Sequence, residues 1–305
     1  MKPDITKECV KSLLDTKFIK VYDLQYAEGK HYYDATRRSV EELIATKTDE
    51  DFKKMLPDAV TCAVILVGDG KKGNAGELGK DGMSGKDSES VCDMVGNCKM
   101  AYECDGNEGT FEPRLLLSRE FRYPAGRFLL SPPAGLIDPE DKEGYLCALA
   151  DESNKISETE LRRLADEALI STAKREIKEE TGLTVGPDDD IFVINQLLFS
   201  TPGMTDESNA LVCAVIDVGD ALKAEAVKEN LSYGEASKAD CVKLIENILT
   251  TEGAVGSEVF DGFVLVTEAE AREIIKKGRD SYDNFFSVYT WCVLMYFVSG
   301  MWKQN

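Results

Sequence analysis

Three glutamates stand close together in residues 174–183, which read KREIKEETGL. On a helix, at about 100° per residue, Glu176, Glu179 and Glu180 share one edge of the helix surface. Like charges one turn apart repel each other and weaken an isolated helix. A hard divalent cation would turn this repulsion into coordination, because Mg²⁺ binds a few carboxylates together with water and phosphate oxygens. The pattern therefore indicates a metal site, and the alternative is a solvated acidic face on a very acidic chain.

The surrounding pattern predicts the element that positions these glutamates. Residues 158–181 predict a long helix that ends at Gly182, with Pro187 beyond it. Apolar residues recur at helical spacing and define the face that should pack on the core: Leu161, Ala165, Leu169, Ala173 and Ile177. One face of the helix would then pack, while the adjacent edge carries the carboxylates.

The other predicted elements alternate along the chain and indicate an α/β (α+β) fold, with a mixed sheet covered by helices. Residues 17–40 predict a β-hairpin, and residues 39–54 predict a helical connector. Further strands are expected at 60–67, 114–122, 128–130, 191–199, 210–218 and 259–266, and further helices at 268–277 and 285–302. Residues 68–112 are rich in Gly, Asp and Lys, so they are expected to form a long excursion.

The spacing of the glutamates resembles the Nudix box, G-x5-E-x7-R-E-U-x-E-E-x-G-U, in which U is aliphatic. The second half of the box matches at every defined position: Glu167, Arg175, Glu176, Ile177, Glu179, Glu180, Gly182 and Leu183. In the first half, Leu161 occupies the site expected for glycine. The natural box glycine is Gly135 in the run PPAGLID at 132–138, which implies an insertion at about 139–163. Glu167 is interpreted as a brace for this loop, or as a plain surface glutamate.

Three further segments resemble the ADP-ribose and ADP-sugar pyrophosphatase branch of the Nudix hydrolases. They are YYDATRR at 32–38, REFRYP at 119–124 and STPGMTDE at 200–207. The resemblance implies an α/β/α sandwich with a mixed sheet and an N-terminal β-hairpin region. Residues 1–58 would then serve dimerisation and base binding, and residues 59–305 would form the hydrolase domain with inserts at about 68–112 and 139–163. A homodimer with composite sites is also implied.

The resemblance implies Mg²⁺, with Mn²⁺ as an alternative, between the helix and a substrate diphosphate. The implied ligands are Glu176, Glu179, Glu180 and the backbone carbonyl of Ala134, and Arg175 would brace the glutamates. A catalytic base is expected in a loop before a late strand, where Glu252 and Glu258 both qualify. Glu258 is preferred because it adjoins the predicted strand at 259–266.

The resemblance also implies six substrate-binding residues: Tyr33, Arg38, Arg122, Gly135, Pro202 and Asp206. Arg122 would meet a phosphate, since a guanidinium suits bidentate recognition. Tyr33 would stack an adenine and Arg38 would clamp the base or the phosphates. The alternatives are half-buried aromatic residues in an ordinary hairpin and a tight Pro-Gly turn at 202–203.

The charge of the chain disfavours several classes of partner. Of the 305 residues, 36 are Lys or Arg and 56 are Asp or Glu, which gives a formal net charge of −20. No global positive field would attract nucleic acid or an anionic membrane. The N-terminus has no apolar signal region, and the longest apolar stretch, 289–301, is too short to span a bilayer. The nine cysteines are mostly isolated, and Cys92, Cys98 and Cys104 lack the paired spacing of a zinc site, so a cytoplasmic location is expected.

These observations predict an enzyme that uses Mg²⁺ to hydrolyse the pyrophosphate bond of ADP-ribose or a related nucleoside diphosphate sugar. The products would be AMP, or another nucleoside monophosphate, and a sugar phosphate. Three alternatives stay open: another nucleotide substrate such as a UDP-sugar, a dinucleotide or a nucleoside triphosphate; a non-catalytic nucleotide-binding module; and a purely structural helical protein.

Overall fold

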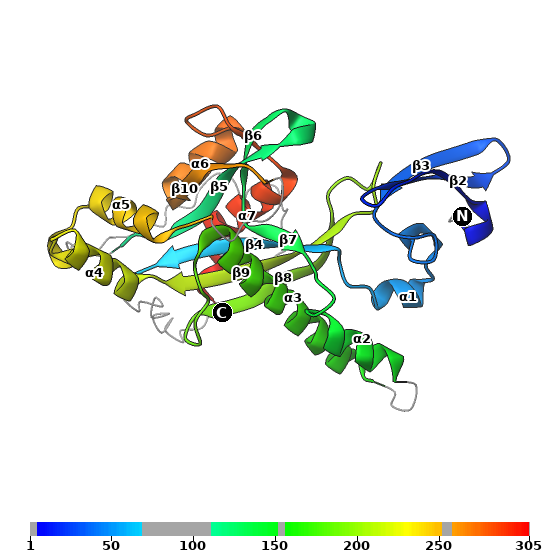
Figure 1. The fold of residues 1–305 in the computed structure, drawn as a ribbon, viewed down its shortest axis with the longest axis horizontal. Helices are drawn as coiled ribbons and strands as arrows, with labels where there is room; N and C mark the ends of the chain where they lie inside the picture. The colour runs from blue at the N-terminus through cyan, green and yellow to red at the C-terminus, as the bar shows by residue number, and fades with distance from the viewer. Residues whose placement is uncertain (1–4, 69–110, 152–155, 252–257, 305) are drawn as a thin grey trace, which may run out of the picture.

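A mixed β-sheet forms the centre of the molecule (Figure 1). The computed structural model describes residues 5–68, 111–151, 156–251 and 258–304. The sheet has the strand order β11-β6-β5-β4-β9-β8, while β10 pairs with β5 and β7 pairs with β4. Its strands are β4 (Ala59–Val67), β5 (Arg114–Arg122), β6 (Arg127–Ser131), β7 (Ala134–Leu136), β8 (Asp190–Phe199), β9 (Ser208–Asp217), β10 (Phe260–Val266) and β11 (Phe285–Phe286). The β4–β9 and β11–β6 pairs are parallel and the others are antiparallel.

Helices cover both faces of this sheet and build two apolar cores. One core contains side chains from α3 (Glu158–Thr181), α4 (Gly219–Lys228) and α5 (Lys238–Ile248). The other contains side chains from α6 (Glu268–Lys277) and α7 (Val288–Ser299). Because side chains alternate along a strand, Cys62 and Val64 of β4 enter the first core, whereas Ala63 and Ile65 enter the second. The predicted α/β/α sandwich with a mixed sheet is confirmed.

The N-terminal region forms a second, antiparallel sheet at one end of the molecule (Figure 1). The predicted hairpin consists of β2 (Lys20–Ala27) and β3 (Lys30–Thr36), and Gly29 turns the chain at φ 65°. A strand that was not predicted, β1 (Val10–Asp15), pairs with β2. This small sheet contacts the turn after β8, because the Tyr32 hydroxyl donates to the Gly203 carbonyl at 2.8 Å.

Helix α3 has the predicted bounds. The Ser157 hydroxyl accepts a hydrogen bond from the Glu160 backbone and caps the N-terminus. At the other end Gly182 adopts φ 75°, and its N–H donates to the Lys178 carbonyl. Ala165, Leu169, Ala173 and Ile177 are buried, as their spacing predicts, and Leu161 is partly buried.

Other element predictions need correction. The segment 39–54 holds only the 3-10 turn η2 (Ile44–Thr46) and the short helix α1 (Asp49–Lys53), because Thr48 caps a new helix start there. Residues 285–302 begin with β11, and α7 begins only after Ser287 caps it. Helices α4 and α5 were not predicted, and the 139–163 insertion contains helix α2 (Glu143–Ala150) as well as the start of α3.

Some sequence predictions fall on parts of the chain that the structure does not describe. Cys92, Cys98 and Cys104, most of the 68–112 excursion and Glu252 lie outside the described residues. Within the described part, Cys62, Cys213 and Cys241 are buried and Cys147 is exposed. No helix among the described residues has the length and hydropathy needed to cross a membrane.

Candidate active site

The α3 glutamates face a cavity of about 1050 Å³. Its lining includes the C-terminal half of α3, the start of β4, the segment around β7, the end of β5, and the turns at 200–201 and 287–289. Glu176, Glu179 and Glu180 all line it, together with Glu258 and Arg122. Residues that are distant in the sequence therefore meet at one cavity, which is large enough for a nucleotide-sized ligand.

Glu180 lies near the C-terminus of α3 and is only 7% exposed. One carboxylate oxygen, Oε2, accepts a hydrogen bond from the Ala134 backbone N–H at 3.3 Å. Burial, followed by the neighbouring charges of Glu176, Glu258 and Glu120, raises the pKa of Glu180 to about 9. The carboxylate also stands in the last turn of α3, where the helix dipole disfavours negative charge. A bound cation would relieve all of these costs.

Glu176 is buried beside Glu180 and contacts two structural partners. Arg175 Nη1 donates to Glu176 Oε1 at 2.6 Å. Burial raises the pKa of Glu176, although the Arg175 charge opposes that shift. On its other side the carboxyl lies against Gly135, where an added Cβ atom would overlap it. The glycine that was predicted to bind substrate thus makes room for a candidate metal ligand.

Arg175 connects the helix to the loop after β7. Its guanidinium donates to the Leu136 carbonyl at 2.8 Å and to the Asp141 carboxylate at 3.2 Å. Ion pairs also join it to Asp138 at 3.2 Å and to Glu179 at 3.4 Å. Arg175 therefore links α3 to this loop, and it also contacts Glu176 and Glu179, two of the glutamates that it is expected to brace.

Glu167 is placed elsewhere. It is exposed and pairs with Arg163 on the same helix, so the structure places it as a surface residue and not as a brace for the loop.

Arg122 and Glu258 stand at the cavity with the α3 glutamates. Arg122 Nη2 pairs with the buried Glu120 carboxylate at 2.6 Å. Glu258 is exposed, and the next residue is tied to β5 by a 2.8 Å hydrogen bond from the Phe121 N–H to the Val259 carbonyl. Glu258 is thus placed at the cavity, whereas the other candidate base, Glu252, lies outside the described residues.

Four predicted substrate-binding residues lie away from this cavity. Tyr33 is 58% exposed on β3 and does not line this cavity. Arg38 is bound by Asp58 at 2.6 Å and by Asp206 at 3.2 Å, so its guanidinium serves an internal ion-pair network. The expected Tyr33–Arg38 clamp is therefore not assembled at the glutamates within one chain.

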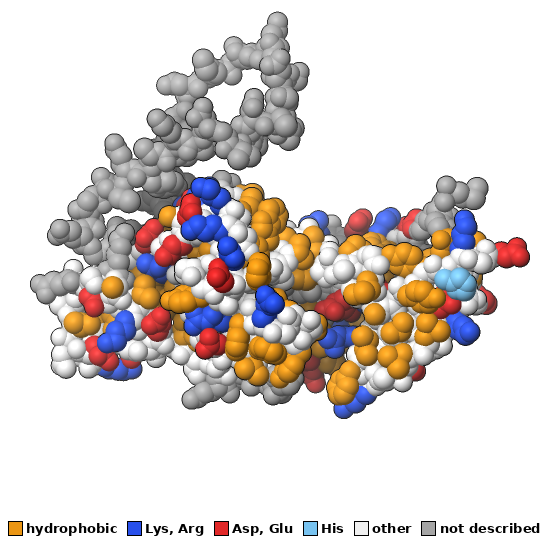
Figure 2. Space-filling model, turned by 90° about the horizontal axis from the view of Figure 1, so that it is seen from above, with side chains coloured by type: hydrophobic (Ala, Val, Ile, Leu, Met, Phe, Trp, Pro, Cys, Tyr) orange, Lys and Arg blue, Asp and Glu red, His pale blue; other side chains and the backbone are white. Residues whose placement is uncertain are grey.

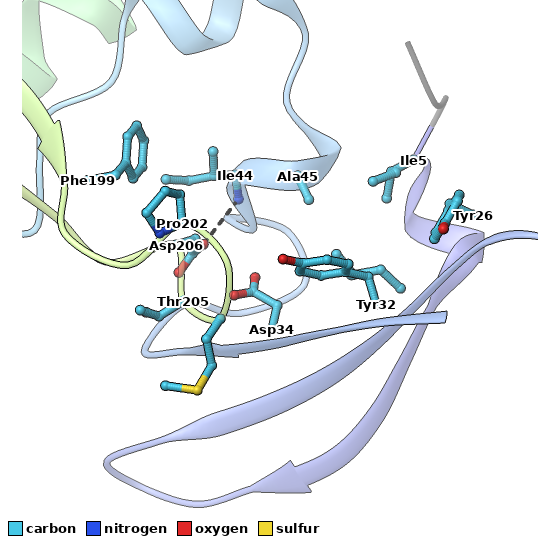
Figure 3. A pocket seen from close by; sticks show the side chains of 12 residues that line it. Ile5, Tyr26, Tyr32, Asp34, Ile44, Ala45, Phe199, Pro202, Thr205 and Asp206 are labelled. Atoms are coloured by element: carbon cyan, nitrogen blue, oxygen red, sulfur yellow. Dashed lines mark hydrogen bonds between the residues drawn. The ribbon is translucent and has the colours of Figure 1, made fainter. Parts of the chain in front are cut away.

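Pro202 and Asp206 line a second cavity of about 510 Å³, between the N-terminal sheet and the turn after β8 (Figure 3). Its lining is mostly apolar, and the Asp34 carboxylate points into it. Burial and the charge of Asp206 raise the pKa of Asp34 to about 6. Of the predicted substrate-binding residues, two line the larger cavity and two line this one, whereas Tyr33 and Arg38 line neither.

Arg37 is a cavity residue that sequence analysis did not select. It lines the larger cavity and is exposed, and within the described ranges no ion pair or side-chain hydrogen bond holds it. Sequence reasoning chose its neighbour Arg38, because nothing local shows which of two adjacent arginines meets Asp58 and Asp206. Glu120 and Asp141 were missed for the same reason, since their partners are brought to them by the fold.

The residue types at the larger cavity fit a hard divalent cation. As their side chains are placed, no group of three or more His, Cys, Asp or Glu residues among those described is close enough to hold a metal ion. However, Mg²⁺ uses only one or two protein carboxylates and fills its other positions with water and phosphate oxygens. Glu176 and Glu180 are buried carboxylates whose charge a cation would neutralise, so they are the residues that would hold it.

The raised pKa of Glu180 predicts how the cation-free protein responds to pH. Between the usual value of 4.5 and about 9, the folded state keeps a proton that the unfolded state has lost. Glu180 therefore makes the protein less stable as pH rises through this window. Thermal unfolding in a chelator should show that Glu180→Gln is more stable than the wild type, by a margin that grows from about pH 5 to about pH 9. A margin that stays constant with pH would contradict the assignment.

No protein-family model matches the chain. Part of it is similar to a protein from Caenorhabditis elegans named "Putative nudix hydrolase 2", with 33% identity over 107 residues. The match covers 35% of this chain and 34% of that protein, so the chain spans about a third of its relative. The chain thus resembles a nudix hydrolase over part of its length.

A solved structure described as "Crystal structure of ADP compounds hydrolase" covers 96% of this chain and 94% of that chain. Its sequence identity is 14% and its TM-score is 0.39, which is too low to support an argument about this protein.

Proposed function

We propose that this protein hydrolyses the pyrophosphate bond of a nucleoside diphosphate sugar, such as ADP-ribose, with the help of Mg²⁺ or Mn²⁺. The observation that carries the proposal is the pair of buried glutamates on α3, Glu176 and Glu180, which line a large cavity. Arg175 and Gly135 contact Glu176 there. A structural role does not account for Glu180, because a buried carboxyl group with no ion-pair partner among the described residues destabilises a fold.

The proposed roles follow from where each side chain lies. Glu176 and Glu180 hold the cation, and Glu179, at the edge of the cavity, adds a third carboxylate. The cation, when bound, would neutralise the diphosphate and stabilise the leaving group. Arg122 donates hydrogen bonds to a phosphate oxygen of the substrate. The exposed Glu258 accepts the proton from the attacking water.

A substrate panel tests this function. Purified protein would be incubated with ADP-ribose, an ADP-sugar, a UDP-sugar, a dinucleotide and a nucleoside triphosphate, each with Mg²⁺ or with EDTA. Chromatography of the products should show a nucleoside monophosphate and a sugar phosphate from at least one nucleotide sugar, only with the cation. Turnover of the dinucleotide or triphosphate alone would assign the enzyme another substrate. Binding without turnover would indicate a nucleotide-binding module.

Arg37 should contribute to substrate binding in this reaction. Its guanidinium lines the cavity, where no described residue holds it in an ion pair, so it can donate to an anionic or hydroxyl-rich part of the ligand. A hydrogen bond to a charged group contributes about 1.5–3 kcal/mol. Arg37→Gln is therefore expected to raise KM by about tenfold or more, with a smaller change in kcat. Steady-state kinetics would check this, with Arg279→Gln as a control because Arg279 pairs with Asp283 on the surface and does not line this cavity. An unchanged KM would remove Arg37 from the site.

The homodimer that the sequence predicts remains a proposal. Apolar side chains gather on the end of the molecule that carries the N-terminal sheet (Figure 2). The exposed apolar residues of this region are Leu13, Leu14, Phe18, Ile19, Tyr32 and Tyr33. Exposed clusters of this kind often mark protein interfaces, and a partner subunit could place Tyr33 at a composite site.

A further inference from the structure

Glu120 and Arg122 form an ion pair with one buried end and one open end. Both belong to β5, two residues apart, so their side chains leave the same face of the strand. Glu120 Oε2 and Arg122 Nη2 are 2.6 Å apart. The Glu120 side chain is 9% exposed, whereas the Arg122 side chain is 48% exposed and lines the larger cavity. The carboxylate is therefore the fixed partner and the guanidinium is the one that can reach a ligand.

The fold holds Glu120 firmly. In the sheet, Glu120 pairs with Leu129 of β6 on one side and with Phe260 of β10 on the other, so hydrogen-bonded strands flank it on both sides. The Ser131 hydroxyl also donates a hydrogen bond to its carboxylate. A carboxylate with this support can set the direction of the arginine that binds it.

A purely stabilising role does not explain this carboxylate. Burial raises the pKa of Glu120; Arg122 and Ser131 oppose the shift, and the charge of Glu258 adds to it. Glu120 in turn contributes to the raised pKa of Glu180, after burial, Glu176 and Glu258. A further negative charge beside a group of glutamates costs stability, and a buried ion pair is often no better than a neutral substitute. Orienting Arg122 would explain why the fold keeps this costly buried carboxylate.

We propose that Glu120 is a positioning residue, which holds the Arg122 guanidinium in the cavity so that its remaining N–H groups face a substrate phosphate. The proposal rests on the proposed function, because it takes Arg122 as the group that receives the phosphate. A guanidinium carries five N–H donors in a rigid plane, so fixing one edge against a carboxylate orients the others. Without that anchor, the half-exposed side chain would turn toward solvent.

The kinetic effects of substituting Glu120 should distinguish a role in orienting Arg122 from a role in stabilising the fold. Glu120→Ala should raise KM for the nucleotide sugar about tenfold, with kcat changed less than about threefold, because Arg122 binding is weakened. Glu120→Gln keeps an oxygen that accepts from Arg122 Nη2, so it should recover most of the wild-type KM. Glu268→Ala is the control, because it breaks a 2.7 Å Glu–Arg pair on α6 that does not line the cavity. This control should leave KM unchanged.

A double-mutant cycle tests whether Glu120 acts through Arg122. Arg122→Ala should raise KM about tenfold or more, and adding Glu120→Ala to it should raise KM no further. Thermal unfolding of each variant would show that it is folded. An unchanged KM in Glu120→Ala would overturn the proposed role of Glu120, and so would effects of the two substitutions on KM that multiply. In either case, turnover by the wild type would still support the proposed function. An absence of turnover in the wild type would instead overturn the proposed function, and this proposal with it.

Discussion

Glu180→Gln is expected to slow hydrolysis by about 10³-fold, the upper range for the loss of one preorganised electrostatic group at a reaction centre. Glu180 is buried at the cavity, and its surroundings raise the pKa of its carboxyl group to about 9. The amide has nearly the same shape as the carboxylate and can still accept the hydrogen bond from the Ala134 N–H. It cannot supply the negative charge that a divalent cation requires. The loss should therefore appear in kcat, and the fold should remain intact.

Glu167→Gln is the matched control for this result. Glu167 belongs to the same helix, but it is exposed and pairs with Arg163 away from the cavity. It should keep wild-type turnover and cation dependence. Full activity in Glu180→Gln, with a cation requirement like that of the wild type, would show that Glu180 is not a ligand.

Gly135→Ala is expected to lower activity by about 10²-fold, because a displacement of about 1 Å at a reaction centre can have that effect. The added Cβ would overlap the carboxyl of Glu176. Because that carboxyl is the end of a flexible side chain, Glu176 can move aside and the fold should survive. The cation site would then lose its geometry while keeping all of its glutamates.

Gly144→Ala provides the control for this second substitution. Gly144 lies in helix α2, and no atom stands within 4 Å of the Cβ that the substitution would add. Alanine also favours a helix over glycine by about 1 kcal/mol, so the control should be at least as stable as the wild type. Kinetics and thermal unfolding measured together would separate the two effects. Wild-type kinetics in Gly135→Ala would contradict the role of Gly135 in placing Glu176.

The helix that carries the glutamates is predictable because its signals are local. Ser157 and Gly182 mark its ends, and apolar residues such as Leu169 and Ile177 recur at helical spacing between them. The hairpin of β2 and β3 is predictable for the same reason, since Gly29 supports the turn between two alternating strands. These features depend on neighbours within one or two turns of chain.

Two short helices were missed although they carry recognisable signals. Ser237 and Asp240 form a capping box at the start of α5, and Leu244 and Ile245 supply its buried face. In α4 the apolar pair Leu222 and Ala226 lies at helical spacing. Both segments are rich in charged residues, so their composition does not reveal the few apolar residues that form the buried face of each helix.

The partners of the arginines could not be predicted, because distant segments create them. Arg38 meets Asp206 only after the N-terminal sheet has docked on the turn that follows β8. Arg37, one residue away, lines the larger cavity instead. The pairing of Arg175 with Asp141 likewise requires the loop after β7 to fold back on α3.

Cation-dependent turnover is the most direct test of the central claim, that the α3 glutamates form the reaction centre of a pyrophosphate hydrolase. Product formation from a nucleotide sugar would be followed across a titration of Mg²⁺ for the wild type, Glu180→Gln and Glu167→Gln. The account predicts that the wild type and Glu167→Gln form a nucleoside monophosphate and a sugar phosphate in proportion to bound cation, whereas Glu180→Gln forms almost none. Turnover that is independent of the cation, or equal in all three proteins, would contradict it.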